Sequence, residues 1–95
     1  MKTINLDKYS PLISSQEVGE EIHSFLLKQL DKHEVVEVNL GSIKTMATFC
    51  AKQIFGQLYV SLSAEKFFER IKLINVNEDL QMIIRLGILS AIKNE

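Results

Sequence analysis

The side chains that could perform covalent chemistry are few in this chain, and they do not cluster in the sequence. Cys50 is the only cysteine, and His23 and His33 are the only histidines. A nucleophilic cysteine needs a neighbouring base or cation that lowers the pKa of its thiol. No histidine lies near Cys50 in the sequence, and the residue falls on the apolar face of an expected helix. We therefore expect Cys50 to be a small buried side chain rather than a nucleophile.

The remaining polar residues do not form a motif for metal, phosphate or acid–base chemistry. Neither histidine has a partner at the spacing of a zinc site. Glu17, Glu20 and Glu21 lie close together, but near a helix start such residues usually form a solvated face that complements the helix dipole. The glycines follow neither the Gly-x-Gly-x-x-Gly nor the Walker pattern. The sequence therefore predicts no metal, no cofactor and no catalytic residue, so the protein is not expected to be an enzyme.

The composition is that of one ordinary globular domain. The chain has 95 residues, of which 46% are hydrophobic and 24% charged, and its formal net charge is −1. These values predict a single domain over residues 1–95 with its own core. The 11 basic residues are scattered, which argues against a nucleic-acid partner. One cysteine, no signal-peptide pattern and no bilayer-spanning stretch predict a cytoplasmic protein without a membrane segment.

Three short segments have the alternation or the apolar run of a β-strand. They are residues 3–6, 34–40 and 71–76. Helical periodicity occupies the intervals between them and the end of the chain. The order β–α–β–α–β–α favours parallel strands joined by right-handed crossovers. The sequence therefore predicts an α/β fold, with a small and largely parallel sheet of three to four strands and helices packed on it.

Each expected helix has a recognisable start. Ser14 and Glu17 form a capping box for the first helix, and Thr45 or Thr48 is suited to cap the second. Asn77 is expected to cap the last helix. A glycine at position 87 of that helix costs about 1 kcal/mol relative to alanine. We expect this glycine to be there because it lets the helix approach the sheet closely.

Aromatic residues widen the apolar stripe of the second helix and follow it in the next turn. Phe67 and Phe68 are adjacent, and adjacent residues rarely both face inward, so one of the two rings should pack in the core. The other ring, together with Tyr59, is available to form an exposed patch for a partner or a second copy. The candidate partner surface consists of Phe49, Lys52, Tyr59 and Phe67.

Four blocks, taken in order, resemble the bacterial STAS-like domains of unknown function, which are related to the STAS domains of anti-sigma-factor antagonists. They are S-S-Q-E-V-G at 14–19, V-E-V-N-L at 36–40, T-F-C-A-K-Q-I-F-G-Q-L at 48–58 and F-F-E-R-I-K-L-I at 67–74. The best-matched parts are residues 54–58 and the Arg70–Ile71 pair. The chain departs from the family at Asn39, where the family has aspartate, and at Lys52 and Gln53, where it has two acidic residues.

The resemblance implies a function that the residues alone do not. In STAS antagonists a hydroxyl at the start of the second helix is phosphorylated by a partner kinase, and Thr48 stands at that position. The resemblance therefore implies a non-catalytic regulatory module that binds a protein partner, such as a kinase or an ATPase, and is switched by phosphorylation. Two alternatives stay open. Thr48 is also suited to be an ordinary helix cap, and the alternative function is a self-associating homodimer without a switch.

Overall fold

Three short parallel strands form the sheet on which the helices pack. The computed structural model describes residues 1–93. In it β1 (Lys2–Asn5), β3 (Val36–Asn39) and β5 (Ile71–Ile74) lie in the order β1-β3-β5, and both pairs are parallel. The predicted α/β fold with a small parallel sheet is confirmed, and the strand ends differ from the predicted ones by one or two residues. The expected domain over 1–95 also includes residues 94–95, which lie outside the described part.

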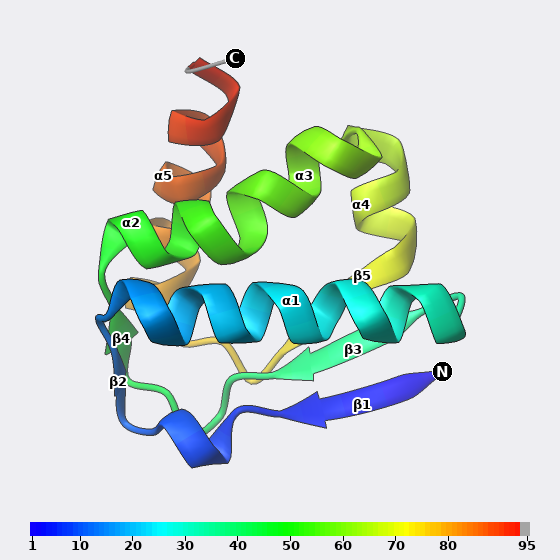
Figure 1. The fold of residues 1–95 in the computed structure, drawn as a ribbon. Coiled ribbons are helices and arrows are strands. Elements are labelled where there is room, and N and C mark those ends of the chain that lie inside the picture. Colours follow the sequence, from blue (N-terminus) through cyan, green and yellow to red (C-terminus); the bar gives the residue numbers. More distant parts are fainter. Residues whose placement is uncertain (94–95) are drawn as a thin grey trace.

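The helices all lie on one face of this sheet (Figure 1). Alternate residues of a strand point to opposite faces. The strand residues that face the helices are buried: Ile4, Val36, Val38 and Ile71. On the other face Thr3, Glu37 and Lys72 stand side by side, and the Thr3 hydroxyl donates a hydrogen bond to the Glu37 carboxylate at 3.0 Å. The molecule therefore has two layers, with a polar outer sheet face.

A second, two-stranded parallel sheet joins β2 (Leu12–Ile13) to β4 (Thr45–Met46). The 3-10 turn η1 (Asp7–Tyr9) precedes β2. The sequence predicts neither of these two strands. Two residues per strand are too few to show an alternation, so the pattern carries no strand signal. The small sheet fixes the start of the next helix, because β4 leads directly into it.

The first helix, α1 (Gln16–Lys32), begins one residue later than the capping box predicts. Ser15 is the N-cap, and its hydroxyl accepts a hydrogen bond from the Val18 N–H at 3.1 Å. The predicted use of Ser14 is wrong because two adjacent serines offer the same hydroxyl, and only the path of the chain selects one. The inner stripe of the helix is buried, as its 3.6-residue spacing predicts: Ile22, Leu26 and Leu30.

One continuous helical segment forms the centre of the helical layer. It consists of α2 (Thr48–Ala51), the π-helical turn η2 (Lys52–Gly56) and α3 (Gln57–Leu62). Its inner side chains are fully buried: Cys50, Ala51, Ile54, Phe55 and Leu58. The predicted helix is confirmed, and its apolar stripe is buried. The sequence does not predict the π-helical turn, a wider turn of a kind often found at functional sites.

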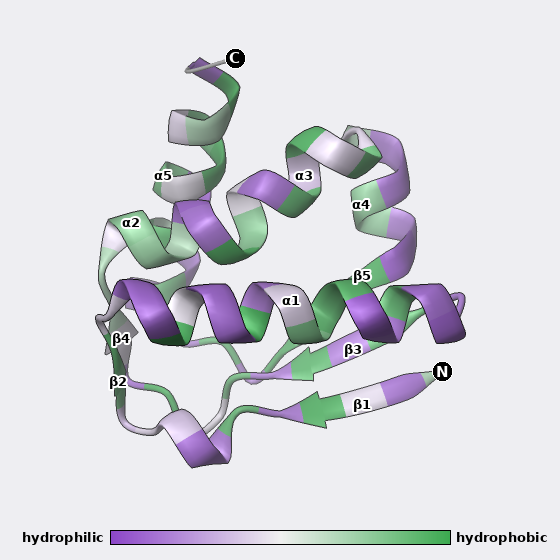
Figure 2. Cartoon of the chain, viewed as in Figure 1, coloured by the Kyte–Doolittle hydropathy of each residue, from purple (hydrophilic) through white to green (hydrophobic). Residues whose placement is uncertain are grey.

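Two further helices complete the layer. α4 (Ala64–Arg70) follows Ser63, whose φ is 81°, and leads directly into β5. α5 (Glu78–Lys93) begins at the predicted N-cap, since the Asn77 side chain accepts a hydrogen bond from the Leu80 N–H at 2.8 Å. Figure 2 shows hydrophobic residues along most of α5, whereas hydrophobic and hydrophilic residues alternate along α1. None of the described helices is long and apolar enough to span a bilayer.

The contact between α5 and the central helical segment depends on two glycines. A Cβ placed on Gly87 would lie 2.6 Å from the backbone nitrogen of Lys52 and 2.8 Å from the Ala51 Cβ. A Cβ placed on Gly56 would lie 2.8 Å from the Gly87 carbonyl oxygen. The expected role of Gly87 against the sheet is therefore wrong. The residue is needed because helix packs on helix at this crossing, with almost no space between the two backbones.

Candidate functional site

Thr48, the candidate regulatory residue, is exposed and is the first residue of α2. The N-cap of this helix is Ala47, and no side-chain hydrogen bond caps it. The prediction that Thr45 or Thr48 caps the helix is wrong. The Ala47 N–H donates to the Ile13 carbonyl at 2.9 Å, so the pairing of β2 with β4 determines where the helix begins. Tertiary pairing has overridden the capping preference of threonine, and the hydroxyl of Thr48 is left at the surface.

The first turn of α2 lies at the edge of the molecule where the three parallel strands end. Figure 1 shows the starts of α1, α2 and α5 at this same side. The carboxyl ends of parallel strands are the usual place for a binding site in α/β proteins. No acidic residue occupies the first turn of α2. An anion at Thr48 would therefore meet the positive end of the helix dipole without a like charge in that turn.

An asparagine ladder ties the ends of the three strands together at this edge. Asn39 on β3 donates to the Asn5 side-chain oxygen at 2.9 Å, and Asn75 donates to the Asn39 oxygen at 3.0 Å. The same Asn39 oxygen also accepts from the Gly41 N–H at 2.9 Å. Because the amides satisfy one another, the ladder holds the strand ends in register. Asn39, which departs from the family pattern, therefore has a structural role here.

The four residues of the candidate partner surface form two separate groups. Phe49 is 53% exposed and lies one turn before Lys52, which is half-buried. Tyr59 is half-buried and lies about 15 Å beyond Phe49 along the helical segment, given its rise of about 1.5 Å per residue. Phe67 contacts Tyr59 there, with the ring centroids 5.4 Å apart. Thr48 is therefore close along the helix to Phe49 and Lys52 but not to the other two.

Phe67 and Phe68 divide as the sequence predicts, with one ring inside and one outside. Phe67 is only 2% exposed, whereas Phe68 is 61% exposed. The ring of Phe68 packs edge-on against Phe67 at 5.4 Å and against Tyr59 at 6.0 Å. The exposed aromatic of the pair is thus Phe68. The assignment of Phe67 to the candidate partner surface is wrong, because its ring packs in the core beneath Phe68. The sequence could not decide between them, because both positions suit a short helix and only the docking of α4 separates them.

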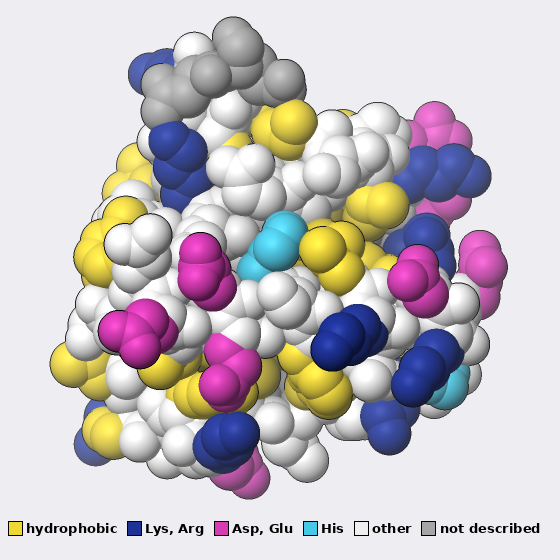
Figure 3. All heavy atoms as spheres, viewed as in Figure 1, with side chains coloured by type: hydrophobic (Ala, Val, Ile, Leu, Met, Phe, Trp, Pro, Cys, Tyr) yellow, Lys and Arg dark blue, Asp and Glu magenta, His cyan; other side chains and the backbone are white. Residues whose placement is uncertain are grey.

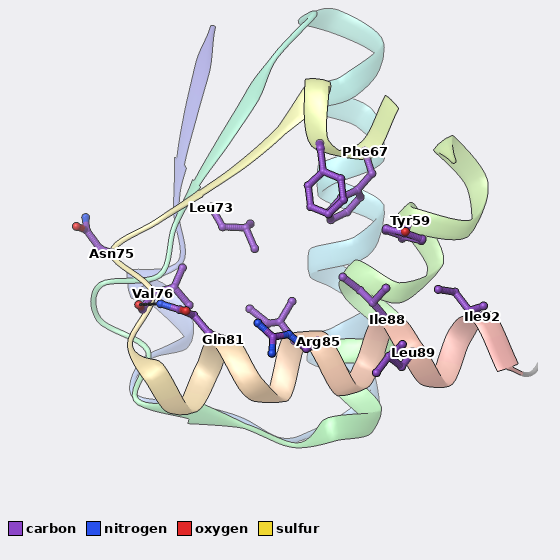
Figure 4. A pocket seen from close by; sticks show the side chains of 12 residues that line it. Tyr59, Phe67, Leu73, Asn75, Val76, Gln81, Arg85, Ile88, Leu89 and Ile92 are labelled. Atoms are coloured by element: carbon purple, nitrogen blue, oxygen red, sulfur yellow. Dashed lines mark hydrogen bonds between the residues drawn. The ribbon is translucent and has the colours of Figure 1, made fainter. Parts of the chain in front are cut away.

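A groove that the sequence analysis did not identify opens between α5, α4 and β5. Its volume is about 680 Å³, and Figure 4 shows side chains of both walls pointing into it. Phe67, Phe68 and Leu73 line one wall, and Ile88, Leu89 and Ile92 line the other. The signal that could have located it is α5 itself. A helix that is apolar on more than one side is usually buried or covered by a partner.

Two ionisable groups that interact directly, Tyr9 and Glu21, lie outside the groove. The Tyr9 hydroxyl donates a hydrogen bond to the Glu21 carboxylate, and the Lys8 ammonium lies 3.5 Å from the same carboxylate. Burial raises the pKa of Tyr9 to about 12, and its hydrogen bond to Glu21 and the charge of Glu21 add to the effect. A phenol that ionises less readily is the opposite of an activated base or nucleophile. The pair therefore joins η1 to α1.

The raised pKa of Tyr9 predicts a loss of stability at high pH. Between the unfolded pKa of about 10 and the folded pKa of about 12, the unfolded chain releases the Tyr9 proton while the folded chain keeps it. The stability is therefore complete below pH 10 and falls as the pH rises towards 12. Urea unfolding at several pH values should show this fall, and the fall should be smaller in Tyr9→Phe. An equal fall in both proteins would contradict the assignment.

Cys50, the candidate nucleophile of the sequence, is also placed for a structural role. Cys50 is fully buried, as predicted, and burial raises the pKa of its thiol. The face in Figure 3 shows acidic and basic side chains interspersed, with no large patch of one sign. Within residues 1–93, no three histidine, cysteine or acidic side chains come together as metal ligands. The described surface therefore offers two candidate contact regions. Thr48 and Phe49 lie at one end of the helical segment, and the groove lies at the other end.

The comparison with family models agrees with the order of elements. A model described as a STAS-like domain of unknown function matches residues 18–81, which run from α1 into the first turn of α5. The matched segment contains Thr48, the π-helical turn and the Arg70–Ile71 pair. No curated protein and no solved structure matches the chain.

Proposed function

Because the chain belongs to the family of STAS-like domains of unknown function, we propose that it is a non-catalytic regulatory module that binds a protein partner and is switched at Thr48. The observation that carries the proposal is the position of Thr48. It is an exposed hydroxyl at the start of a helix, and the exposed ring of Phe49 stands beside it. The partner is a protein of the kinase or ATPase type, which binds the surface around Thr48 and phosphorylates the Thr48 hydroxyl.

The start of α2 is physically suited to carry a phosphate. The first N–H groups of a helix lack partners within it, and the helix dipole stabilises negative charge there. Lys52 lies four residues after Thr48, which places it one turn away on the same side of the helix. A phosphate adds about −1.5 to −2 charges. The fold therefore tolerates a phosphate on Thr48. A partner that buries Phe49 would have to desolvate that charge, so phosphorylation breaks the contact.

A negative charge at Thr48 is expected to abolish the partner interaction without unfolding the protein. We expect tagged wild type and Thr48→Ala, expressed in the native host, to recover the same partner. Thr48→Glu should recover at least tenfold less of it, because the new carboxylate must be desolvated in the contact. Quantitative mass spectrometry of the captured proteins measures the ratio, and the same spectra report phosphorylation of the Thr48 peptide.

The matched control for this experiment is Gln57→Glu. Gln57 is exposed on α3 and belongs to the same helical segment, so this variant adds one charge without touching the start of α2. It should recover the partner as well as the wild type does. Equal recovery by Thr48→Glu and wild type would contradict the switch. Recovery of no specific protein, together with a concentration-dependent dimer in light scattering, would favour the homodimer alternative.

The homodimer alternative has one observation in its favour. Met82 and Leu86 lie one turn apart on the outer side of α5, and they are 65% and 48% exposed. Large apolar side chains exposed side by side often mark an interface. The regulatory proposal is the better supported of the two, because it accounts for Thr48 within the family-matched segment.

A further inference from the structure

We propose that the groove between α5, α4 and β5 binds an amphipathic helix of a protein partner, and that this helix presents a carboxylate to Arg85. The inference rests on the proposed binding function and names a second contact surface. Thr48 does not line the groove. The two surfaces can therefore be tested separately.

The groove has the length of a short helix. The α5 residues that line it begin at Gln81 and end at Ile92. At 1.5 Å per residue this wall is about 17 Å long, or about three helical turns. The facing wall combines aromatic rings from α4 with Leu73 from β5 (Figure 4). An apolar groove of this length is what proteins use to receive an amphipathic helix through side chains at i, i+3, i+4 and i+7.

The rim of the groove favours a helix over a small ligand. Phe68 on one wall is 61% exposed, and Leu89 and Ile92 on the other are 46% and 42% exposed. A small molecule on the floor would leave the outward parts of these side chains in water. A helix with its side chains is about 10–12 Å across and presents side chains along its whole length, so it buries more of these rims than a small molecule does. Burial of these rims is the main source of affinity that the groove can offer.

Arg85 specifies the charge of the occupant. It is exposed, it lines the groove, and no carboxylate among residues 1–93 lies within ion-pair distance of it. The other polar side chains of the lining are neutral: Tyr59, Asn75 and Gln81. The amide of Gln81 already donates to the Val76 carbonyl at 3.1 Å. The lining thus carries one positive charge and no negative charge, and an aspartate or glutamate on the incoming helix complements it.

The same charge argues against a second copy of this chain as the occupant. Arg85 lies close to the middle of the α5 wall, which spans residues 81–92. A two-fold contact centred on the groove would therefore bring two Arg85 side chains together. Neither copy offers a carboxylate from its groove lining to separate them. Like charges placed together at a contact are repulsive, which disfavours a two-fold contact centred on the groove, and we therefore assign the occupant to a different chain.

The test uses the full chain and a phage-displayed library of 16-residue helical peptides randomised on one face. The library is first depleted on Leu89→Glu and then selected on the wild type. We expect the enriched peptides to share large apolar residues at i, i+3 or i+4, and i+7, together with an aspartate or glutamate. Fluorescence polarisation of the best synthetic peptide should then give at least a tenfold loss of affinity with Arg85→Glu. Replacing the peptide's acidic residue by lysine should restore binding to Arg85→Glu.

The controls separate this proposal from the function on which it rests. Lys28→Glu changes an exposed lysine of α1 outside the groove and should bind the peptide as the wild type does. Thr48→Glu should also bind it normally, so a failed switch at Thr48 leaves the groove proposal standing. Circular dichroism checks that every variant is folded. The proposal is overturned if no peptide is enriched, if Arg85→Glu binds equally well, or if Arg85→Glu creates or abolishes a dimer in sedimentation.

Discussion

Replacing Gly87 by alanine is expected to destabilise the protein by about 3 kcal/mol, although alanine is the better helix former by about 1 kcal/mol. The new methyl group would lie 2.6 Å from the Lys52 nitrogen and 2.7 Å from the Ala51 carbonyl carbon. Both are backbone atoms inside a buried helical segment, so neither can rotate away as a side chain would. The two helices must separate, and this opens the contact between α5 and the central helical segment.

Thermal unfolding followed by circular dichroism measures the effect. For a domain of this size, a loss of 1 kcal/mol lowers the Tm by roughly 4–8 °C. Arg85→Ala is the matched control, because Arg85 lies on the same helix, is exposed and forms no ion pair with another residue in 1–93. It should change the stability by less than about 0.5 kcal/mol. If Gly87→Ala is too unstable to purify, Gly56→Ala probes the other side of the same crossing. A Tm in either glycine variant equal to that of the wild type would disprove the close-packing argument.

The Gly87 contact shows what local patterns could not predict. The spacing of apolar residues located the helices and the three strands, because each pattern depends only on neighbours in the sequence. The surface that Gly87 meets lies 35 residues earlier in the chain, so the sequence showed an unusual glycine but not its neighbour. The strand pair β2–β4 and the N-cap at Ala47 were missed for the same reason. Both depend on a hydrogen bond between distant segments.

The two candidate sites, Thr48 and the groove, also differ in whether local patterns could locate them. Thr48 could be located from sequence, because its position follows from the order of elements and from a resemblance between blocks. The groove could not, because its walls come from α3, α4, β5 and α5 and meet only in the folded chain. Arg85 on its own is an ordinary exposed arginine. It becomes informative only when its neighbours prove to be apolar or neutral.

Replacing Arg70 by methionine is expected to destabilise the protein by about 2–3 kcal/mol. The Arg70 guanidinium donates to three backbone carbonyls, those of Leu30 at 2.6 Å, His33 at 3.1 Å and Glu34 at 3.0 Å. These carbonyls lie at the end of α1 and just after it, where backbone acceptors lack helical partners and the dipole favours a cation. One side chain at the end of α4, directly before β5, therefore holds the end of α1 beside the sheet.

Methionine keeps much of the apolar stem of Arg70 but leaves all three carbonyls without this donor. Arg70→Lys keeps the charge, but a single ammonium group cannot reproduce the planar fork, so it should lose about half as much stability. Arg85→Met is the matched control, because Arg85 makes no hydrogen bond or ion pair with another residue in 1–93. Urea unfolding should rank the proteins as wild type and Arg85→Met, then Arg70→Lys, then Arg70→Met. The resemblance of the Arg70–Ile71 pair to the family pattern would then be explained by the carbonyls at the end of α1 that Arg70 binds. Equal stability of Arg70→Met and Arg85→Met would show that the three contacts add nothing.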